Sequence, residues 1–331
     1  MKKLLVLGMS ALVLMVSAEA RACASCGCTL STDWENMNFT KGGGFTFDLR
    51  YDYLDQDQLR AGTGTISPVA ASRISHDGDP QEVEKYTRNT YVTAALDYGN
   101  GDWGVNVSVP YIKRDHETLG TASDGVTPGP DGGSYISSTS DIGDVRIVGR
   151  YTGFTPRHNI GLMFGLKLPT GKTGLTGTST DPTEPDPVTI DPGLQPGSGT
   201  TDLIVGGYYA DSFSQHWSYY AQALYQSAFD TIHAYRPGDG YNLNLGIKYT
   251  GFDGFNPQLQ LNARYVHHDT GANADTVSTG GTLVYLSPGV AVPLNTRISL
   301  YGFVQLPVYQ DVRGVQLAPK YTVSAGTRFS F

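Results

Sequence analysis

Apolar residues recur at every second position in a series of segments about ten residues long, and this period is the feature that most constrains the fold. The clearest segment runs from Phe45 to Tyr53, where each odd position is apolar and each even position is threonine or charged. A period of two gives a β-strand one apolar and one polar face. Comparable segments follow at residues 87–98, 103–113, 142–152, 158–168, 201–211, 216–228, 240–250, 257–268, 282–293, 296–307 and 321–331.

The connections between these twelve segments alternate in length. Tight turns occupy 98–103, 152–158, 211–216, 250–257 and 293–296, whereas long loops occupy 54–86, 114–140, 169–200, 229–239, 269–281 and 308–320. An even strand number, with short turns at one end and long loops at the other, is typical of an outer-membrane barrel. Each segment is also close to the length that a tilted strand needs to cross a bilayer. We therefore predict an all-β fold, a transmembrane antiparallel β-barrel of about 12 strands over residues 43–331.

The composition agrees with a chain whose outer face contacts outer-membrane lipid. Charged residues make up 16% and aromatic residues 11% of the chain, and soluble domains usually carry about 25% charged residues. The formal net charge of −8 argues against a nucleic-acid partner, because such proteins normally show a basic surface. The expected partners are membrane lipid and a small-molecule solute.

The first 42 residues precede the alternating pattern. Lys2 and Lys3, an apolar stretch over 4–17 and the small residues around Glu19 predict a signal peptide over residues 1–20. Residues 21–42 then form a Cys-rich N-terminal segment that we expect in the periplasm. This arrangement places the barrel in a Gram-negative outer membrane, with the short turns on the periplasmic side.

All three cysteines of the chain, Cys23, Cys26 and Cys28, lie within six residues of that segment. Thiolates so close together can form a disulfide, bind copper or zinc, or exchange electrons or metal with a periplasmic redox or metal-carrying protein. The spacing leaves these alternatives open.

If the apolar positions face lipid, the alternate positions face the lumen. Eight of the charged lumen candidates are basic and four are acidic, although the whole chain is acidic. A basic lumen that is open favours anions, whereas Asp–Arg pairs across strands would instead fill a narrow barrel. The candidates are Asp48, Arg50, Asp52, Asp97, Asp144, Arg146, Arg150, Lys167, Lys248, Arg264, Arg297 and Arg328.

No catalytic arrangement accompanies the barrel pattern. Twelve-stranded barrels include a phospholipase whose histidine and serine lie two positions apart on one strand, and neither Ser75-His76 nor His267-His268 reproduces that spacing. We therefore expect a protein that is not an enzyme. The loop at 169–200 contains six prolines and several acidic residues, a composition that predicts either a surface tether or a segment folded into the barrel mouth.

Several short motifs resemble those of the transporter-like outer-membrane barrels associated with the meta-pathway of phenol degradation. They lie at 140–145, 168–171, 305–310 and 314–317, and the resemblance extends over residues 43–331. The cysteine-rich start, which leads to Asp33 and Trp34, looks like that of a subset of such barrels. The resemblance implies a barrel that carries small aromatic or hydrophobic molecules.

Together these patterns predict an outer-membrane channel or transporter that passes small solutes, either aromatic and hydrophobic or anionic, by passive diffusion. The alternative is a non-conducting barrel that anchors the Cys-x-x-Cys-x-Cys segment as a metal-binding or redox module.

Overall fold

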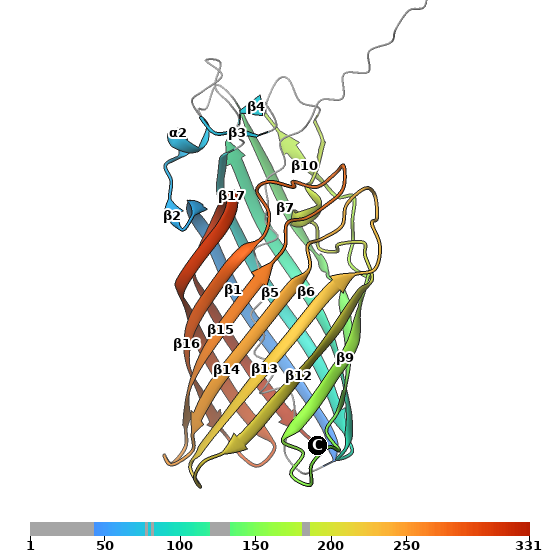
Figure 1. Ribbon diagram of the computed structural model, residues 1–331, viewed down its shortest axis with the longest axis vertical. Helices are drawn as coiled ribbons and strands as arrows, with labels where there is room; N and C mark the ends of the chain where they lie inside the picture. Colours follow the sequence, from blue (N-terminus) through green and yellow to red (C-terminus); the bar gives the residue numbers. More distant parts are fainter. Residues whose placement is uncertain (1–42, 77–78, 81–82, 120–132, 181–185) are drawn as a thin grey trace, which may run out of the picture.

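The computed structural model describes residues 43–76, 79–80, 83–119, 133–180 and 186–331. These residues form an elongated barrel of tilted strands (Figure 1). Helical structure is confined to α2 (Pro68–Ala71) and the 3₁₀ turn η2 (Pro192–Leu194). No helix in the described part of the chain is long and apolar enough to cross a membrane.

Eleven assigned strands form a closed antiparallel ring in the described residues. A closed ring pairs the backbone groups of every wall strand, which is what a hydrocarbon environment requires. The ring closes where β8 pairs with β6. Its order is β6 (Trp103–Leu119), β5 (Val83–Gly99), β1 (Gly44–Gly62), β17 (Ile298–Ser330), β16 (Gly281–Pro293), β15 (Asn256–Val266), β14 (Gly240–Tyr249), β13 (Trp217–Ala228), β12 (Asp202–Ser212), β9 (Ile160–Leu168) and β8 (Val145–Tyr151).

The longest strand, β17, crosses the wall twice. Its first half pairs with β16 from Ser299 to Val312, and its second half pairs with β1 as far as Ser330. The Ser330 N–H donates to the carbonyl oxygen of Arg297 at 2.8 Å, so the two ends of β17 lie together and the chain reverses direction inside it. The reversal coincides with Gly314, whose φ of 58° is a left-handed conformation that glycine adopts without strain. With β17 counted twice, the wall has the twelve crossings that the sequence pattern predicts.

The remaining strands lie toward the end of the barrel with the long loops. Strand β7 (Ser134–Ile142) pairs with the part of β6 that extends beyond β8. Strands β10 (Thr176–Ser179) and β11 (Val188–Thr189) extend the sheet beyond β7. Strand β2 (Gly64–Thr65) pairs with β1, while β3 (Ser75–His76) and β4 (Asp79–Pro80) form a separate two-stranded sheet. Figure 1 shows these elements at the top and the chain's C-terminus at the bottom.

The predicted extent of three of the long loops is partly wrong. Strand pairing continues through much of 54–86 and 114–140 and through all of 308–320, because β1 reaches Gly62, β6 reaches Leu119 and β17 is unbroken. Above the membrane both faces of a strand meet polar surroundings, so the apolar alternation ends although the backbone ladder continues. The expected strand at 142–152 also starts earlier, as β7, and is interrupted at residues 143–144.

The two faces of the wall have opposite character. Outward positions are exposed and apolar, such as Leu49, Leu162, Leu243 and Leu286, whereas many inward positions are buried and polar. Large exposed aromatic residues gather at the turn end, where the rings of Phe213 and Trp217 stack at 5.9 Å. This distribution is that of a barrel with lipid outside, and it means that any solute path lies among the inward polar residues.

Candidate functional site

Inward aromatic rings pack against glycines on one side of the lumen. Tyr208 and Tyr220 are nearly fully buried, and each ring lies against a glycine of the neighbouring strand. A Cβ added at Gly161 would overlap the ring of Tyr208, and one at Gly246 would overlap the ring of Tyr220. Tyr301 and Phe303 lie against Gly326 and Gly289 in the same way. These rings therefore fill part of the lumen on the β12–β17 side.

A ladder of amide side chains crosses the same side. The Asn244 amide donates to Gln222 Oε1 at 3.0 Å, and the Asn262 amide donates to Asn244 Oδ1 at 2.8 Å. The Ser287 hydroxyl completes the ladder by donating to Asn262 Oδ1 at 2.7 Å. All four side chains are buried and hydrogen-bonded, so they form a fixed polar wall rather than a flexible lining.

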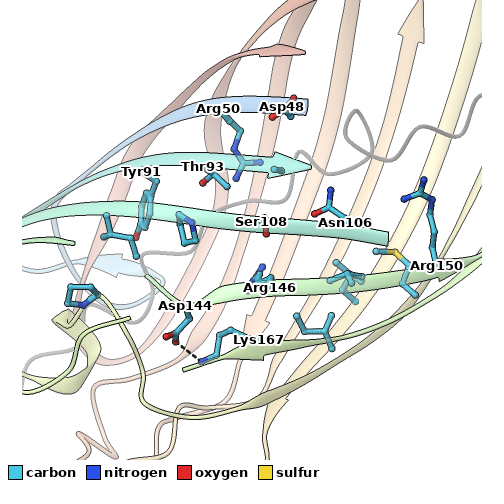
Figure 2. Close-up of a pocket in the computed structure, with 18 residues that line it drawn as sticks. Asp48, Arg50, Tyr91, Thr93, Asn106, Ser108, Asp144, Arg146, Arg150 and Lys167 are labelled. Atoms are coloured by element: carbon cyan, nitrogen blue, oxygen red, sulfur yellow. Dashed lines mark ion pairs between the residues drawn. The ribbon is translucent and has the colours of Figure 1, made fainter. Parts of the chain in front are cut away.

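A cavity of about 230 Å³ lies mainly against β1, β5, β6, β8 and β9, with one residue each from β12 and β13 (Figure 2). Part of its lining is apolar and includes Ile112, Val148, Met163, Ile204 and Leu224. The charged part contains four basic side chains and two acidic ones. These residues are Asp48, Arg50, Asp144, Arg146, Arg150 and Lys167.

Ion pairs hold most of these charges in place. Arg150 forms a bidentate pair with Asp97, with N–O distances of 2.5 and 2.7 Å. Lys167 lies between two carboxylates, at 3.1 Å from Asp144 and 3.0 Å from Asp202. On β1, Arg50 pairs with Asp52 at 2.8 Å, and Arg328 of β17 lies 3.6 Å from Asp48. Pairs of this kind rigidify the wall. The side chains that line the cavity directly include four basic and two acidic ones, and the carboxylates of Asp52, Asp97 and Asp202 lie behind them as ion-pair partners.

Arg146 of β8 contacts a neutral side chain of β13. It projects from β8 into the cavity and is half-buried (Figure 2). Its guanidinium donates to the amide oxygen of Gln226 at 2.6 Å, and Gln226 in turn donates to Asp202 at 2.6 Å. Arg146 therefore reaches an acidic group through a neutral amide.

A segment of the chain folds into the barrel mouth above this cavity. We call residues 190–200 the inner segment. Ile190 and Leu194 are about 1% exposed and pack against Tyr135 and Leu175. Of the two expectations for the 169–200 loop, the described part follows the second, a segment in the mouth rather than a tether.

Arg114 of β6 fastens the first part of the inner segment. Its guanidinium donates to the carbonyl oxygen of Gly193 at 2.8 Å and to that of Gln195 at 3.4 Å. The same side chain is fixed by Asn89 Oδ1 at 2.6 Å and by the Tyr91 hydroxyl at 3.2 Å. The inner segment is thus hydrogen-bonded to a buried cation on the barrel wall.

Asp144 fastens the second part. Its Oδ2 accepts from both the backbone N–H and the hydroxyl of Ser198 at 3.0 Å, and its Oδ1 accepts from the Gly171 N–H at 3.0 Å. Lys167 contacts the Ser198 hydroxyl as well. Because Pro196, between the two attachments, lines the cavity, the inner segment forms its roof on the side of the long loops.

The predicted lumen residues occupy three kinds of position. Six lie buried inside the barrel, five are less deeply buried at inward positions, and Arg297 lies exposed in the β16–β17 turn. The buried six are Asp48, Arg50, Asp52, Asp97, Arg150 and Lys167; the other five are Asp144, Arg146, Lys248, Arg264 and Arg328.

Two functional side chains were missed by the sequence pattern. Arg114 lies one residue beyond the expected end of its strand, at the same parity as the inward Ile112. Asp202 begins a strand in which apolar residues occupy both parities, so its direction was not evident. Extending the parity of 103–113 by one residue would have found Arg114.

The predicted metal or disulfide site at Cys23, Cys26 and Cys28 lies outside the described residues and stays a prediction. Among the residues that are described, no group of three or more histidine, cysteine, aspartate or glutamate side chains is placed to hold a metal ion. The buried histidine inside the barrel, His116, contacts a hydroxyl: its Nδ1 lies 2.8 Å from the Thr87 hydroxyl.

Comparison with known proteins reveals similarity in structure. No protein-family model and no curated protein matches the chain. An outer-membrane channel from Pseudomonas putida F1 matches with a TM-score of 0.57 at 11% identity, over 88% of this chain and 97% of that one. The Ralstonia pickettii toluene transporter TbuX gives 0.46 at 14% identity, over 88% and 90% of the two chains. The β domain of the Bordetella autotransporter BrkA gives 0.48 at 14% identity, over 88% and 100%.

The first of these matches shows that the chain has the fold of an outer-membrane channel. That protein is a channel rather than an enzyme, in line with the expectation that this chain is not an enzyme.

Proposed function

We propose that this chain is a passive outer-membrane channel for small solutes. Export through a signal peptide cleaved near Ala20 would place the short turns and the cysteine segment in the periplasm and the inner segment at the outer face. The observation that carries the proposal is the cavity of about 230 Å³ inside a closed barrel, lined by apolar and charged side chains together.

The lining favours a solute with a small apolar body and a negative end. Ile112, Met163 and Leu224 offer an apolar surface, while Arg50 and Arg146 lie in the same cavity. Basic groups at a constriction raise the local concentration of anions and lower that of cations. The resemblance to barrels associated with phenol degradation supports an aromatic body. Small aromatic anions therefore combine both of the solute classes that the sequence suggests.

Flux into proteoliposomes tests this proposal. Benzoate, benzyl alcohol and benzylammonium have similar size and differ in charge, so their rates, after subtraction of the rates into protein-free liposomes, isolate the electrostatic contribution. We expect benzoate to enter fastest through the purified chain and benzylammonium slowest. Equal rates for the three solutes, or fastest entry of benzylammonium, would contradict a basic lumen.

Substitution of Arg146 by glutamine should reduce the preference for benzoate. One charge a few ångströms from the solute, in a medium between water and protein interior, contributes on the order of 1 kcal/mol, or about fivefold in relative rate. Arg297→Gln removes the same charge in the exposed β16–β17 turn, and it serves as the matched control that should leave the preference nearly unchanged.

A further inference from the structure

A second hollow lies on the outside of the barrel. It has a volume of about 530 Å³ and extends over β12, β13, β14 and β15. Its floor is a row of outward residues on neighbouring strands, where Gly207 pairs with Ala223, Ala223 with Leu243, and Leu243 with Ala263. Three of the four are glycine or alanine, and their small side chains leave a groove between the larger side chains around them.

A row of tyrosines borders this groove on the side of the long loops. Tyr225, Tyr241 and Tyr265 lie directly opposite one another on β13, β14 and β15. Their ring centroids are 4.9 and 6.1 Å apart, and His267 continues the row at 5.0 Å from Tyr265. Tyrosine is enriched where a membrane protein passes from hydrocarbon to headgroups, because the ring is apolar and the hydroxyl is polar.

An exposed arginine lies just beyond the tyrosines. The Arg313 guanidinium donates to the Tyr265 hydroxyl at 3.3 Å and lies 3.0 Å from His268 Nδ1. Neither partner is a carboxylate, and the described residues place no carboxylate within ion-pair distance of Arg313. Arg236 in the same region is different, because it pairs with Asp239 at 3.0 Å. Arg313 thus presents an uncompensated positive charge above an apolar groove.

The apolar groove comes first, the tyrosine row lies above it toward the long loops, and the Arg313 guanidinium lies beyond the tyrosines. A lipid presents its acyl chains and its headgroup in the same order across a leaflet. Acyl chains fit the groove, because a residue of small volume leaves space that hydrocarbon can fill. A guanidinium binds a phosphate oxygen with charge-assisted hydrogen bonds. At this end of the barrel the proposed orientation gives the outer leaflet, whose acylated and phosphorylated lipid is a glycolipid.

We propose that this face of β12–β15 binds a phosphorylated, multiply acylated glycolipid of the outer leaflet, with its acyl chains in the groove and a phosphate at Arg313. The assignment rests on the orientation given under the proposed function, and it does not depend on whether the lumen conducts.

Lipid binding to the full purified chain in phospholipid nanodiscs tests the proposal. The probes are bacterial lipopolysaccharide, the same lipopolysaccharide after enzymatic removal of its phosphates, and phosphatidylglycerol, each detected by native mass spectrometry. We expect phosphorylated lipopolysaccharide to be retained in preference to the other two. Preferential retention of phosphatidylglycerol, or equal retention of the dephosphorylated form, would overturn the proposal.

Two variants address the two halves of the site. Arg313→Gln removes the charge and should weaken retention roughly tenfold, the loss expected for charge-assisted hydrogen bonds to a phosphate. Ala223→Leu fills the groove from an exposed outward position and should weaken it comparably. The controls are Arg157→Gln in an exposed turn residue and Ala221→Leu, two residues along β13 on the same outward face. Retention equal to that of the controls in both site variants would refute the site.

Solute flux measured on the same variants separates this proposal from the channel proposal. Loss of lipid retention with unchanged flux supports the lipid site alone. Normal lipid retention in a chain that conducts nothing would contradict the channel and leave the lipid site intact.

Discussion

Replacement of Arg114 by methionine should loosen the inner segment while leaving the barrel folded. Methionine has a similar length and is apolar, so it keeps much of the packing against Tyr91 and loses the charge. The native guanidinium donates to the carbonyl oxygens of Gly193 at 2.8 Å and of Gln195 at 3.4 Å. The variant loses both contacts.

The expected size of the effect follows from those two contacts. A hydrogen bond to a charged group contributes about 1.5–3 kcal/mol, and the longer contact contributes less than the shorter one. Their joint loss of about 3 kcal/mol corresponds to roughly a hundredfold increase in the population of detached inner segments. Buried Ile190 and Leu194 and the attachment of Ser198 to Asp144 remain, so detachment should be transient rather than complete.

Two measurements on the purified chain report this change. Hydrogen exchange of the backbone amides over residues 190–198 should accelerate, and single-channel records should show more frequent visits to a state of higher conductance. Lys320→Met is the matched control, because it removes an exposed cation whose ion-pair partner is Asp57. Exchange and conductance equal to the wild type in a folded Arg114→Met protein would refute the attachment.

Two other predictions concern the loops and the wall. Burial raises the pKa of Asp269, in the loop between β15 and β16, to about 6 despite hydrogen bonds from Gly238 and Tyr235. Since the folded pKa lies above the unfolded value near 3.8, this loop should become more stable as the pH falls from 8 through 6 toward 4, by up to about 3 kcal/mol. Hydrogen exchange over 267–280, corrected for its intrinsic pH dependence, should show this gain and Asp269→Asn should abolish it; identical pH profiles would count against the assignment. Gly246→Val should displace the Tyr220 ring and lower barrel stability by about 1–3 kcal/mol, seen as a lower temperature of heat-induced unfolding in a gel-shift assay. Ala221→Val, at an outward position, should change this temperature little, and equal temperatures for the two variants would contradict the packing of Tyr220 on Gly246.

The sequence predicts the wall well because lipid and lumen impose opposite requirements on alternate residues. The alternation over Phe45–Tyr53 predicts a strand, and its odd and even positions face outward and inward as expected. The pattern fails where a strand leaves the membrane. Strands β1 and β6 continue beyond their predicted ends because backbone pairing continues, although no apolar face is required there.

The site was only partly accessible from sequence. Parity placed Arg146, Arg150 and Lys167 inside, because each occupies a polar position in a strand with a clear apolar face. It could not reveal that Asp202 shares Lys167 with Asp144, since the register that places Asp202 directly opposite Lys167 on the neighbouring strand is set across a long loop. Composition also could not decide whether the proline-rich loop lies on the surface or in the barrel mouth. Its placement depends on Arg114, a contact 79 residues away in sequence from Gly193.

The reversal potential of the wild-type chain in a planar bilayer under a potassium chloride gradient tests the central claim most directly. The cavity lining has four basic and two acidic side chains, so the account predicts an open conductance whose reversal potential has the sign of chloride selectivity. A reversal potential of the opposite sign, or a folded barrel that conducts no ions, would contradict it.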